Sequence, residues 1–228
     1  MEQDSILSLL KKVHLFSGLT HANLIRIAKI TRRKAYPKNK KIFTENTVGN
    51  TLYIVVSGIV KIFGQTKTRK KTFAFLESNE FFGELALVGE KSRSASAETV
   101  SDSELLAIHR KDFAGLLKKY PEISMNLLKV LCRRLYYADK EIEMVVFHDV
   151  FGRVIQVLMN LLKKYGKNTP YGKSIDFPVN HTEIAELAGT VREMVTKTIS
   201  KLKALKCIDF IDNKIIVTDE KKLKSLMR

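Results

Sequence analysis

Cysteine is scarce in this chain of 228 residues, which contains two, Cys132 and Cys207, far apart and outside any CxxC pattern. An iron–sulfur cluster held by cysteines needs about four thiolates, so the composition argues against that kind of sensor. We expect both cysteines to be free, buried thiols in a reducing compartment. The five histidines show no metal-ligand spacing, so no bound metal is expected. A haem sensor with a histidine ligand is an alternative that no motif supports.

Long apolar runs are missing as well. The N-terminus has early acids and no apolar signal core, and the longest apolar run, near residues 52–60, is broken by Ser57 and Gly58. Such a run is too short to span a bilayer. We therefore expect a cytoplasmic protein. No Ser-His-Asp, Cys-His or paired-carboxylate arrangement accompanies a catalytic motif, so the sequence does not predict an enzyme.

Acidic residues are fewer than basic residues in this chain. The chain has 40 Lys and Arg against 24 Asp and Glu, a net charge of +16 and a pI of about 9.8. A balance this basic favours a polyanionic partner, which is either nucleic acid or an anionic membrane surface. The length suits one large domain or two ordinary ones, each with its own core.

The hydrophobic period changes from helical to alternating and back along the chain. Residues 5–30 show the spacing of two short amphipathic helices. From Ala35 to about Ile108, short β-rich runs alternate with glycine, asparagine and proline, which indicates a small β-barrel or roll. Ser57-Gly58 lies between two apolar runs and predicts a tight hairpin turn.

A long helix is expected over residues 122–147, after a short one over residues 111–120 that ends before Pro121. An apolar stripe along it has residues spaced 3, 4, 3, 4 and 3 apart: Leu128, Leu131, Leu135, Ala138, Ile142 and Val145. This heptad seam is typical of two helices paired as a coiled coil. The alternative is that the stripe packs on the same chain's barrel. Leu127, Val130 and Val146 form a second apolar face suited to that packing.

A third part begins near Asp149, which is a plausible N-cap for a helix over residues 150–164. A polar loop over residues 165–173, a short strand over residues 175–179, two short helices and a final strand pair follow. We expect three regions: a barrel domain at 1–120, a pairing helix and hinge at 121–148, and a third domain at 149–228.

The segment 81–95, FFGELALVGEKSRSA, combines residues suited to a phosphorylated sugar. Gly83 permits close backbone approach, and N–H groups in the short helical turn after it can hold an anion. Glu84 can accept from sugar hydroxyls, while Arg93 offers a fork for phosphate and Ser94 adds a hydroxyl. The alternative is a surface hairpin with an ordinary ion pair.

This segment resembles the phosphate-binding cassette of cyclic-nucleotide-binding domains. The resemblance implies that Arg93 holds the cyclic phosphate and Glu84 the ribose 2′-hydroxyl, and that Arg134 is placed to pair with Glu84. In the bacterial cyclic-AMP receptor pattern, two adjacent hydroxyl residues on the long helix contact the adenine across the dimer. This chain departs from that pattern, since Ala138 and Asp139 stand at those positions. The phosphate and ribose contacts are thus retained, and the effector is cyclic AMP, another cyclic nucleotide or a different molecule. The expected ligand contacts are Gly83, Glu84, Leu85, Arg93, Ser94, Arg134 and Asp139.

Residues 180–202 show the pattern of a helix, a glycine turn and a second helix. Asn180 and Glu183 suit a capping box, and Gly189 lies where the turn needs a positive φ. Polar residues gather at the start of the second helix, as a recognition helix in a major groove requires. Two β-prone pieces around Asp212-Asn213-Lys214 indicate a wing. The expected DNA contacts are Thr182, Thr190, Arg192, Glu193, Thr196, Lys197, Lys201 and Lys214, with base reading assigned first to Arg192 and Glu193.

This segment is similar to the turn and recognition helix of the CRP/FNR regulators. The family pattern G-x-S-R-E-T-V is matched from Gly189 to Val195, except that Val191 replaces the usual helix-capping Ser or Thr. Thr190 with Glu193 is an alternative cap, and it would compete with base reading by Glu193.

The resemblance covers residues 15–217 in the family's domain order. It implies an α+β fold: a double-stranded β-helix or jelly-roll barrel, a long dimerisation helix and a winged helix-turn-helix. We expect a homodimeric transcription regulator that binds a palindromic site on double-stranded DNA, works with RNA polymerase, has no membrane partner and responds to an effector such as cyclic AMP. The alternatives are a DNA-binding regulator without ligand and a cyclic-nucleotide sensor that acts on a protein.

Overall fold

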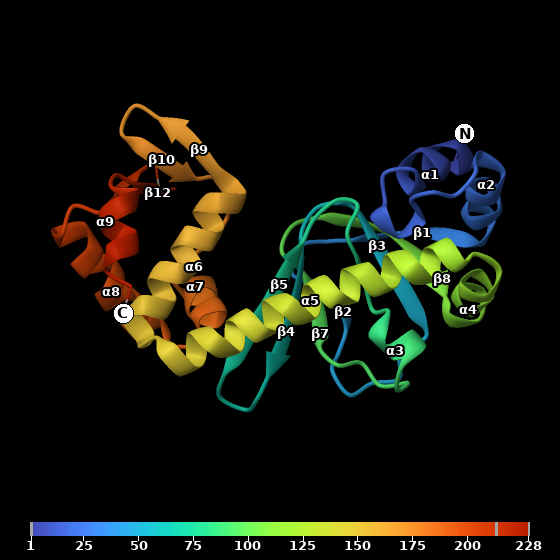
Figure 1. Ribbon diagram of the computed structural model, residues 1–228, viewed down its shortest axis with the longest axis horizontal. Coiled ribbons are helices and arrows are strands. Elements are labelled where there is room, and N and C mark those ends of the chain that lie inside the picture. Colours follow the sequence, from blue (N-terminus) through green and yellow to red (C-terminus); the bar gives the residue numbers. More distant parts are fainter. Residues whose placement is uncertain (1, 213, 228) are drawn as a thin grey trace. The chain divides into compact units, whose positions relative to one another are not determined.

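The computed structural model describes residues 2–212 and 214–227, and the chain divides into two compact units (Figure 1). The first comprises Met1–Thr66 and Thr72–Leu135, and the second comprises Lys67–Lys71 and Tyr136–Arg228. The expected α+β fold, with a barrel-like sheet domain, a long helix and a helix-turn-helix, is confirmed.

The first unit places helices around a β-roll. Its helices are α1 (Glu2–Leu10), the 3-10 helix η1 (His14–Phe16), α2 (His21–Ile30), α3 (Leu85–Val88), α4 (Arg110–Lys119) and the first half of α5 (Pro121–Phe147). Thr20 caps α2, because its side chain accepts a hydrogen bond from the N–H of Asn23 at 3.3 Å. The two helices predicted within residues 5–30 are confirmed, as α1 and α2.

Eight strands form two four-stranded sheets in this unit. The strands are β1 (Thr31–Tyr36), β2 (Lys41–Phe43), β3 (Thr51–Ser57), β4 (Val60–Gln65), β5 (Lys70–Leu76), β6 (Phe81–Phe82), β7 (Ser96–Thr99) and β8 (Ser103–His109). One sheet has the order β1-β8-β3-β6 and the other β2-β7-β4-β5. Most neighbours in these orders are far apart in the chain, as in a roll; among the described strands of these two sheets only β4 and β5 are both neighbours and consecutive.

The predicted hairpin at Ser57-Gly58 is wrong. β3 pairs with β8 and β6, whereas β4 pairs with β7, so the chain passes from one sheet to the other at Gly58. Gly58 has φ +84°, and a Cβ there would lie 2.3 Å from the Ser103 hydroxyl. The sequence signal of a tight turn is the same in both cases, and only the partner strands distinguish a hairpin from a crossover.

Two apolar clusters hold the first unit together. One joins α1, α2, α4 and the start of α5 to the face of β3 and β8 that points away from the other sheet, and it includes Leu10, Ile27, Leu106 and Phe113. The other fills the space between the two sheets. Fully burying a side chain of this size stabilises the folded state by about 1.5–3 kcal/mol.

The helix α5 has two apolar faces, as the sequence predicts. Leu127 is buried and Val130 packs against the core of the first unit. The assignment of Val146 to this packed face is wrong, because its side chain is exposed. The expectation that both cysteines are buried is also wrong, since Cys132 is exposed on α5 and Cys207 alone is buried.

The seam residues on α5 remain largely uncovered in the single chain. Leu128, Leu135, Ile142 and Val145 are between 54% and 64% exposed. A row of large apolar side chains at heptad spacing is costly to leave in water. The described chain therefore offers a surface suited to a second helix.

In the second unit, helices pack on a small sheet. Its elements are the end of α5, α6 (Val150–Tyr165), β9 (Gly166–Thr169), β10 (Gly172–Ile175), α7 (His181–Ala188), α8 (Arg192–Ala204), β11 (Ile208–Ile211), β12 (Lys214–Val217) and α9 (Glu220–Ser225). The sheet order is β11-β12-β10-β9. Asp149 caps α6 as predicted, accepting from the N–H of Gly152 at 2.8 Å. The predicted wing corresponds to the hairpin of β11 and β12. Asn213, which the prediction also named, lies outside the described residues.

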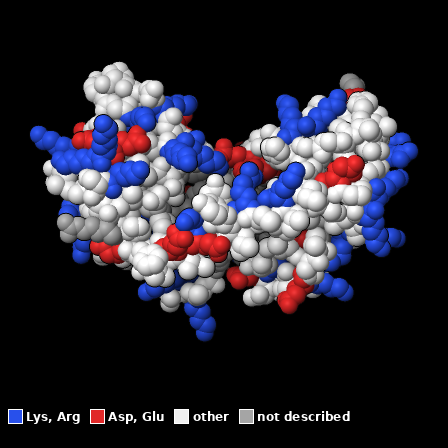
Figure 2. Space-filling model, in the orientation of Figure 1, with Lys and Arg blue, Asp and Glu red and all other residues white. Residues whose placement is uncertain are grey.

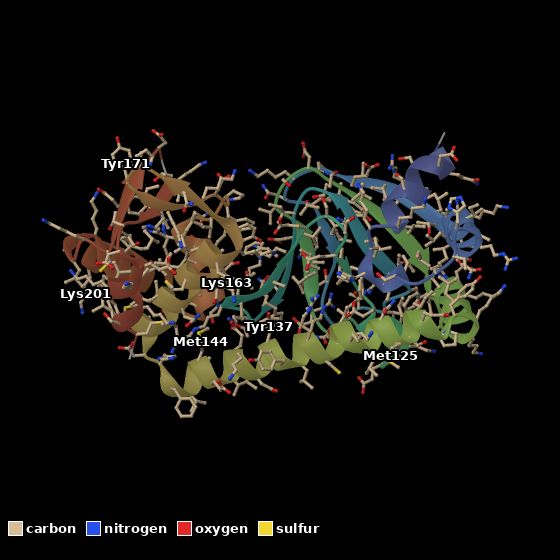
Figure 3. The ribbon with its side chains drawn as sticks, turned by 45° about the horizontal axis from the view of Figure 1, so that its top comes forward. Met125, Tyr137, Met144, Lys163, Tyr171 and Lys201 are labelled. Atoms are coloured by element: carbon tan, nitrogen blue, oxygen red, sulfur yellow. The ribbon has the colours of Figure 1, made fainter. Side chains whose placement is uncertain are left out.

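Two expectations about residues 165–179 are wrong. The polar loop is the antiparallel hairpin of β9 and β10, and the strand expected at 175–179 ends at Ile175. Tyr171 stands at the turn of this hairpin, where Figure 3 labels it. The segment Gly166–Thr169 has little strand propensity of its own. It forms a strand because β10 supplies one hydrogen-bonding edge and is itself paired with β12 on the other.

Candidate functional site

A pocket of about 490 Å³ opens in the first unit. Its wall comes from the loop after β2, from α3, from the loop before β7 and from α5. The lining residues are Asn46, Glu84, Leu85, Val88, Gly89, Glu90, Ser92, Arg93, Ser94 and Leu131. Four of the seven predicted ligand contacts, Glu84, Leu85, Arg93 and Ser94, are thus brought together at one cavity.

Arg93 is the buried cation of this pocket and is only 4% exposed. Its Nη1 donates to the carbonyl of Gly83 at 2.8 Å and its Nη2 to the carbonyl of Thr51 at 2.9 Å. The guanidinium lies 4.1 Å from the ring centroid of Phe43, which provides a cation–π contact. Burial lowers the pKa of Arg93, which reflects the cost of holding a charge away from water.

Two glycines leave room for this guanidinium. Gly83 has φ +85°, and a Cβ on it would lie 2.5 Å from Arg93 Nη1. A Cβ on Gly49 would lie 2.5 Å from Arg93 Nε. Gly83 was predicted from sequence for close backbone approach. Gly49 was not, because its contact with Arg93 joins segments far apart in the chain.

Glu84 is the buried carboxylate of the pocket and is 2% exposed. Its Oε1 accepts from Arg134 Nη1 at 2.6 Å, and Arg134 also donates through Nη2 to the carbonyl of Phe81 at 2.6 Å. The pairing of Arg134 with Glu84 that the sequence suggested is therefore present in the structure. The same contact ties the pocket to the helix α5.

Two buried polar atoms at this pocket lack a partner among the described residues. They are Oε2 of Glu84 and Nε of Arg93. Leaving a buried donor or acceptor unpaired costs about 1–3 kcal/mol, and more for a charged group. One atom accepts hydrogen bonds and the other donates them, so together they suit a ligand that carries both a hydroxyl and an anionic oxygen.

Asp139 is predicted to contact the ligand of the other subunit, so the pocket of one chain does not include it. It is exposed on α5 and is not among the lining residues of the described chain. In contrast, Asn46, Val88 and Leu131 line the pocket although they were not predicted as ligand contacts. Leu131 was recognised only as part of the heptad stripe. Asn46 has φ +63°, and its place between two β-rich runs indicated a turn and nothing about a ligand.

The second unit contains the predicted helix-turn-helix. The capping box of Asn180 and Glu183 starts α7, and Gly189 ends it with φ +63°. Val195, Thr198, Ile199 and Leu202 form the buried side of α8. Along the rest of the helix, Arg192, Glu193, Thr196, Lys197 and Lys201 are exposed. The polar residues therefore face solvent, as the sequence predicts for a groove-reading helix.

Some of these polar side chains already have partners within the chain. The Thr196 hydroxyl donates to the carbonyl of Arg192 at 3.1 Å and lies 3.0 Å from His181 Nδ1. Lys201 Nζ stands 4.5 Å from the ring centroid of Phe151, and Figure 3 labels Lys201 on this unit. Lys214 is paired with Asp176 at 2.6 Å.

The alternative cap at Thr190 and Glu193 is wrong. The N-cap of α8 is Val191, and no side chain caps it. Glu193 is exposed and Thr190 is partly buried at the turn after α7. Glu193 is therefore not held at the helix start by a capping bond, which leaves its carboxylate accessible at the same end of α8 as Arg192.

Basic side chains are visible over both units in Figure 2, so positive charge is not confined to the helix-turn-helix. Within the described residues, no group of three or more His, Cys, Asp or Glu side chains is arranged to hold a metal ion. No described helix is long and apolar enough to cross a membrane.

Comparison with known proteins matches both units. The family model of the cyclic nucleotide-binding domain matches residues 33–120, and that of the Crp-like helix-turn-helix domain matches residues 152–226. The chain is 37% identical over 189 residues to the cyclic AMP receptor protein of Thermus thermophilus, covering 82% of this chain and 84% of that one. It is 30% identical over 187 residues to the global nitrogen regulator of a Nostoc species, covering 81% and 84%.

A solved structure shows the same fold. The c-di-GMP-responsive global regulator CLP of Xanthomonas campestris superposes with a TM-score of 0.78 at 25% identity, covering 87% of this chain and 99% of that one. These matches confirm the resemblance that the glycine–glutamate–arginine loop and the recognition segment suggested. The chain belongs to the CRP/FNR family of DNA-binding transcription regulators, which join a cyclic nucleotide-binding domain to a Crp-like helix-turn-helix.

Proposed function

We propose that this chain is a homodimeric, sequence-specific transcription regulator that is controlled by a cyclic nucleotide in the pocket of the first unit. The observation that carries the proposal is the pair of unpartnered buried atoms, Arg93 Nε and Glu84 Oε2, at one cavity. A cyclic nucleotide has an anionic phosphate oxygen for the first and a ribose hydroxyl for the second. It would satisfy both atoms with one molecule.

Arg93 is preorganised to hold the phosphate. The carbonyls of Gly83 and Thr51 each take one N–H from its two terminal nitrogens, which fixes the plane of the guanidinium. The N–H on Nε and the remaining terminal hydrogens are left for phosphate oxygens, a side-on fork that lysine cannot reproduce. Ser94 and the backbone at Gly83 and Leu85 would complete the phosphate contacts.

The preference for one nucleotide base over another would depend on residues of α5 that lie outside this pocket. Ala138 lacks a hydrogen-bonding group, and the Asp139 carboxylate can accept from an exocyclic amine such as that of adenine. In a dimer this part of α5 would serve the neighbouring subunit's ligand, as in the family pattern. Since the Thermus relative is named for cyclic AMP and CLP for c-di-GMP, cyclic AMP is the first effector to test and other nucleotides follow.

The dimer would form along the exposed seam of Leu128, Leu135, Ile142 and Val145. Ligand contacts at Glu84 reach α5 through Arg134, so occupancy would bias the position of this helix and the hinge near residue 148. The two recognition helices would then meet half-sites of a palindrome about 34 Å apart. Bound in this way, the regulator would act on RNA polymerase.

On the DNA, Arg192 and Glu193 would read base edges, and Lys197 a base or a phosphate. Thr182, Thr190, Thr196, Lys201 and Lys214 would contact the backbone around them. The regions that perform these tasks are 1–120 for sensing, 121–148 for dimerisation and 149–228 for DNA binding.

The test is a calorimetric titration of the purified full chain with cyclic AMP and cyclic GMP, repeated on Arg93→Ala. Lys91→Ala, which removes an exposed cation two residues away, is the matched control. We expect binding that Arg93→Ala loses and Lys91→Ala retains. If the unmodified chain binds neither nucleotide, the effector is a different molecule or the regulator is ligand-independent. If it binds nucleotide without salt-dependent DNA affinity, the output is a protein partner.

A further inference from the structure

Arg110 is the first residue of α4 and donates five hydrogen bonds to two separate segments. Its backbone N–H donates to the carbonyl of Asn50 at 2.8 Å, and its Nε to the Asn50 side-chain oxygen at 3.2 Å. Its Nη2 donates to the carbonyls of Gly49, at 2.9 Å, and Ala86, and its Nη1 to the carbonyl of Leu87 at 3.1 Å. One side chain thus links the loop before β3 to the short helix α3.

These two segments are the walls against which Arg93 rests. A Cβ on Gly49 would lie 2.5 Å from Arg93 Nε and 2.6 Å from the Cβ of Ala86. Thr51, two residues after Gly49, supplies a carbonyl to Arg93 Nη2. Any separation of Gly49 from Ala86 would therefore widen the cradle of Arg93.

The partners of Arg110 are all neutral oxygens within the part of the chain that the structure describes. A half-buried guanidinium with no carboxylate beside it is unusual, since such charges are normally paired. Arg110 and Arg93 are both positively charged, so the two guanidinium groups repel each other. Burial is the main reason that the pKa of Arg93 is lowered, and Arg110 lowers it further, against the effects of Tyr53 and Glu84. The structure therefore keeps Arg110 near Arg93, with its five hydrogen bonds, despite this repulsion.

We infer that Arg110 is a positioning residue for effector binding, which clamps the loop of Gly49 and Asn50 onto α3 so that Arg93 keeps its phosphate-binding geometry. Arg110 does not line the pocket, so it acts through Arg93 and not on the ligand. The inference rests on the proposed function for its ligand. The clamp itself, in which Arg110 holds the two segments together, does not depend on that function.

The clamp is tested on the full chain without ligand, by amide hydrogen exchange. Arg110→Gln removes the fork and the charge, Arg110→Lys removes the fork alone, and Lys111→Gln removes a neighbouring exposed charge that has no part in the clamp. We expect faster exchange over residues 45–51 and 84–89 in both Arg110 variants. In Lys111→Gln the exchange rates of these segments should not change. Exchange at the Gly49 N–H, which donates to the Lys91 carbonyl at 2.8 Å, is the most direct reporter. Unchanged exchange in these segments would overturn the inference, whether or not a nucleotide binds.

The effect on binding is tested by calorimetry with the nucleotide that the unmodified chain binds. We expect Arg110→Gln and Arg110→Lys each to weaken binding by about tenfold, equivalent to about 1.4 kcal/mol, and Lys111→Gln by less than twofold. Full rescue by Arg110→Lys would mean that the charge matters and the clamp does not. In an Arg93→Lys background, which keeps the charge of the phosphate contact, the loss from Arg110→Gln should shrink to less than about threefold. An undiminished tenfold loss there would show that Arg110 does not act through Arg93. A chain that binds no nucleotide would refute the proposed function, and the exchange result would still decide the clamp.

Discussion

The guanidinium of Arg134 on α5 meets the buried carboxylate of Glu84 with an Nη1 to Oε1 distance of 2.6 Å. The other carboxylate oxygen has no partner among the described residues. Glu84 therefore has one oxygen committed to the long helix and one available at the pocket. This division makes Glu84 the link between the pocket and α5, the helix that carries the heptad stripe.

Removing Arg134 should expose how much that link stabilises the fold. Arg134→Ala leaves the Glu84 carboxylate buried with neither oxygen bonded, and we expect the free energy of unfolding to fall by about 1–3 kcal/mol. In a Glu84→Gln background the same substitution should cost clearly less, because no buried charge is left unpaired. Urea unfolding of the four proteins measures the difference. Additive losses would mean that the two residues act separately.

Glycine at position 83 should be required for the pocket. Gly83→Ala forces a Cβ within 2.5 Å of Arg93 Nη1 at a backbone φ of +85°, so we expect weaker nucleotide binding and a loss of about 1–3 kcal/mol in stability. Gly115→Ala is the matched control, because nothing lies within 4 Å of its Cβ and it stands inside α4. For Gly115→Ala we expect unchanged nucleotide binding and an increase of up to about 1 kcal/mol in the free energy of unfolding. Equal effects at the two positions would contradict the assignment.

The heptad seam should determine the oligomeric state. Leu135→Asp places a charge at a seam position, and we expect the dimer to dissociate to monomers at micromolar concentration. Tyr137→Asp is the control, because Tyr137 is about as exposed, 61% against 64% for Leu135, and lies outside the heptad positions. Light scattering or analytical ultracentrifugation distinguishes the two. Dissociation by both variants, or by neither, would place the interface elsewhere.

The recognition helix should separate base reading from backbone contact. Arg192→Ala should weaken binding to the specific site by about 1–3 kcal/mol and relax the preference at one base pair. Lys201→Ala should weaken specific and random DNA alike and reduce the salt dependence of binding. Fluorescence anisotropy on both DNA types at several salt concentrations provides the measurement. Equal losses on both types for Arg192→Ala would refute its role in reading bases.

Asp176, which pairs with Lys214 of the wing, should have a carboxyl pKa below its ordinary value. Hydrogen bonds from Lys167 and Lys214 lower the pKa of this carboxyl to about 2 from its ordinary 3.8. A depressed carboxyl pKa contributes stability that is present above about pH 4 and lost as the pH falls through 2. We expect an NMR titration of the Asp176 carboxyl to give a midpoint near 2, and Lys214→Ala to move it upward. A midpoint at 3.8 in the unmodified protein would show that these pairs do not persist in solution.

Much of the fold was predictable because its signals are local. The helix α8, the glycine after α7 and the capping box of Asn180 and Glu183 are all set by residues within a few positions of each other. The strand series to Ile108 followed from its alternating pattern. The loop that contains Gly83, Glu84 and Arg93 was recognisable because its glycine, carboxylate and guanidinium lie within a dozen residues of each other.

What the sequence by itself determined is the family, the order of the two units and the chemical nature of each site. Only the tertiary structure decided that the chain crosses between sheets at Gly58 and that residues 166–175 form a hairpin. It also decided that Gly49 lies against Arg93, that Leu131 lines the pocket, and that Arg110 joins the two segments beside Arg93. The hairpin adjoins β12 through β10, and each of the other features joins segments tens of residues apart. Periodicity and capping act within one or two turns and carry no record of such contacts, whereas hydrogen-bond partners and packing are set when the whole unit closes on itself.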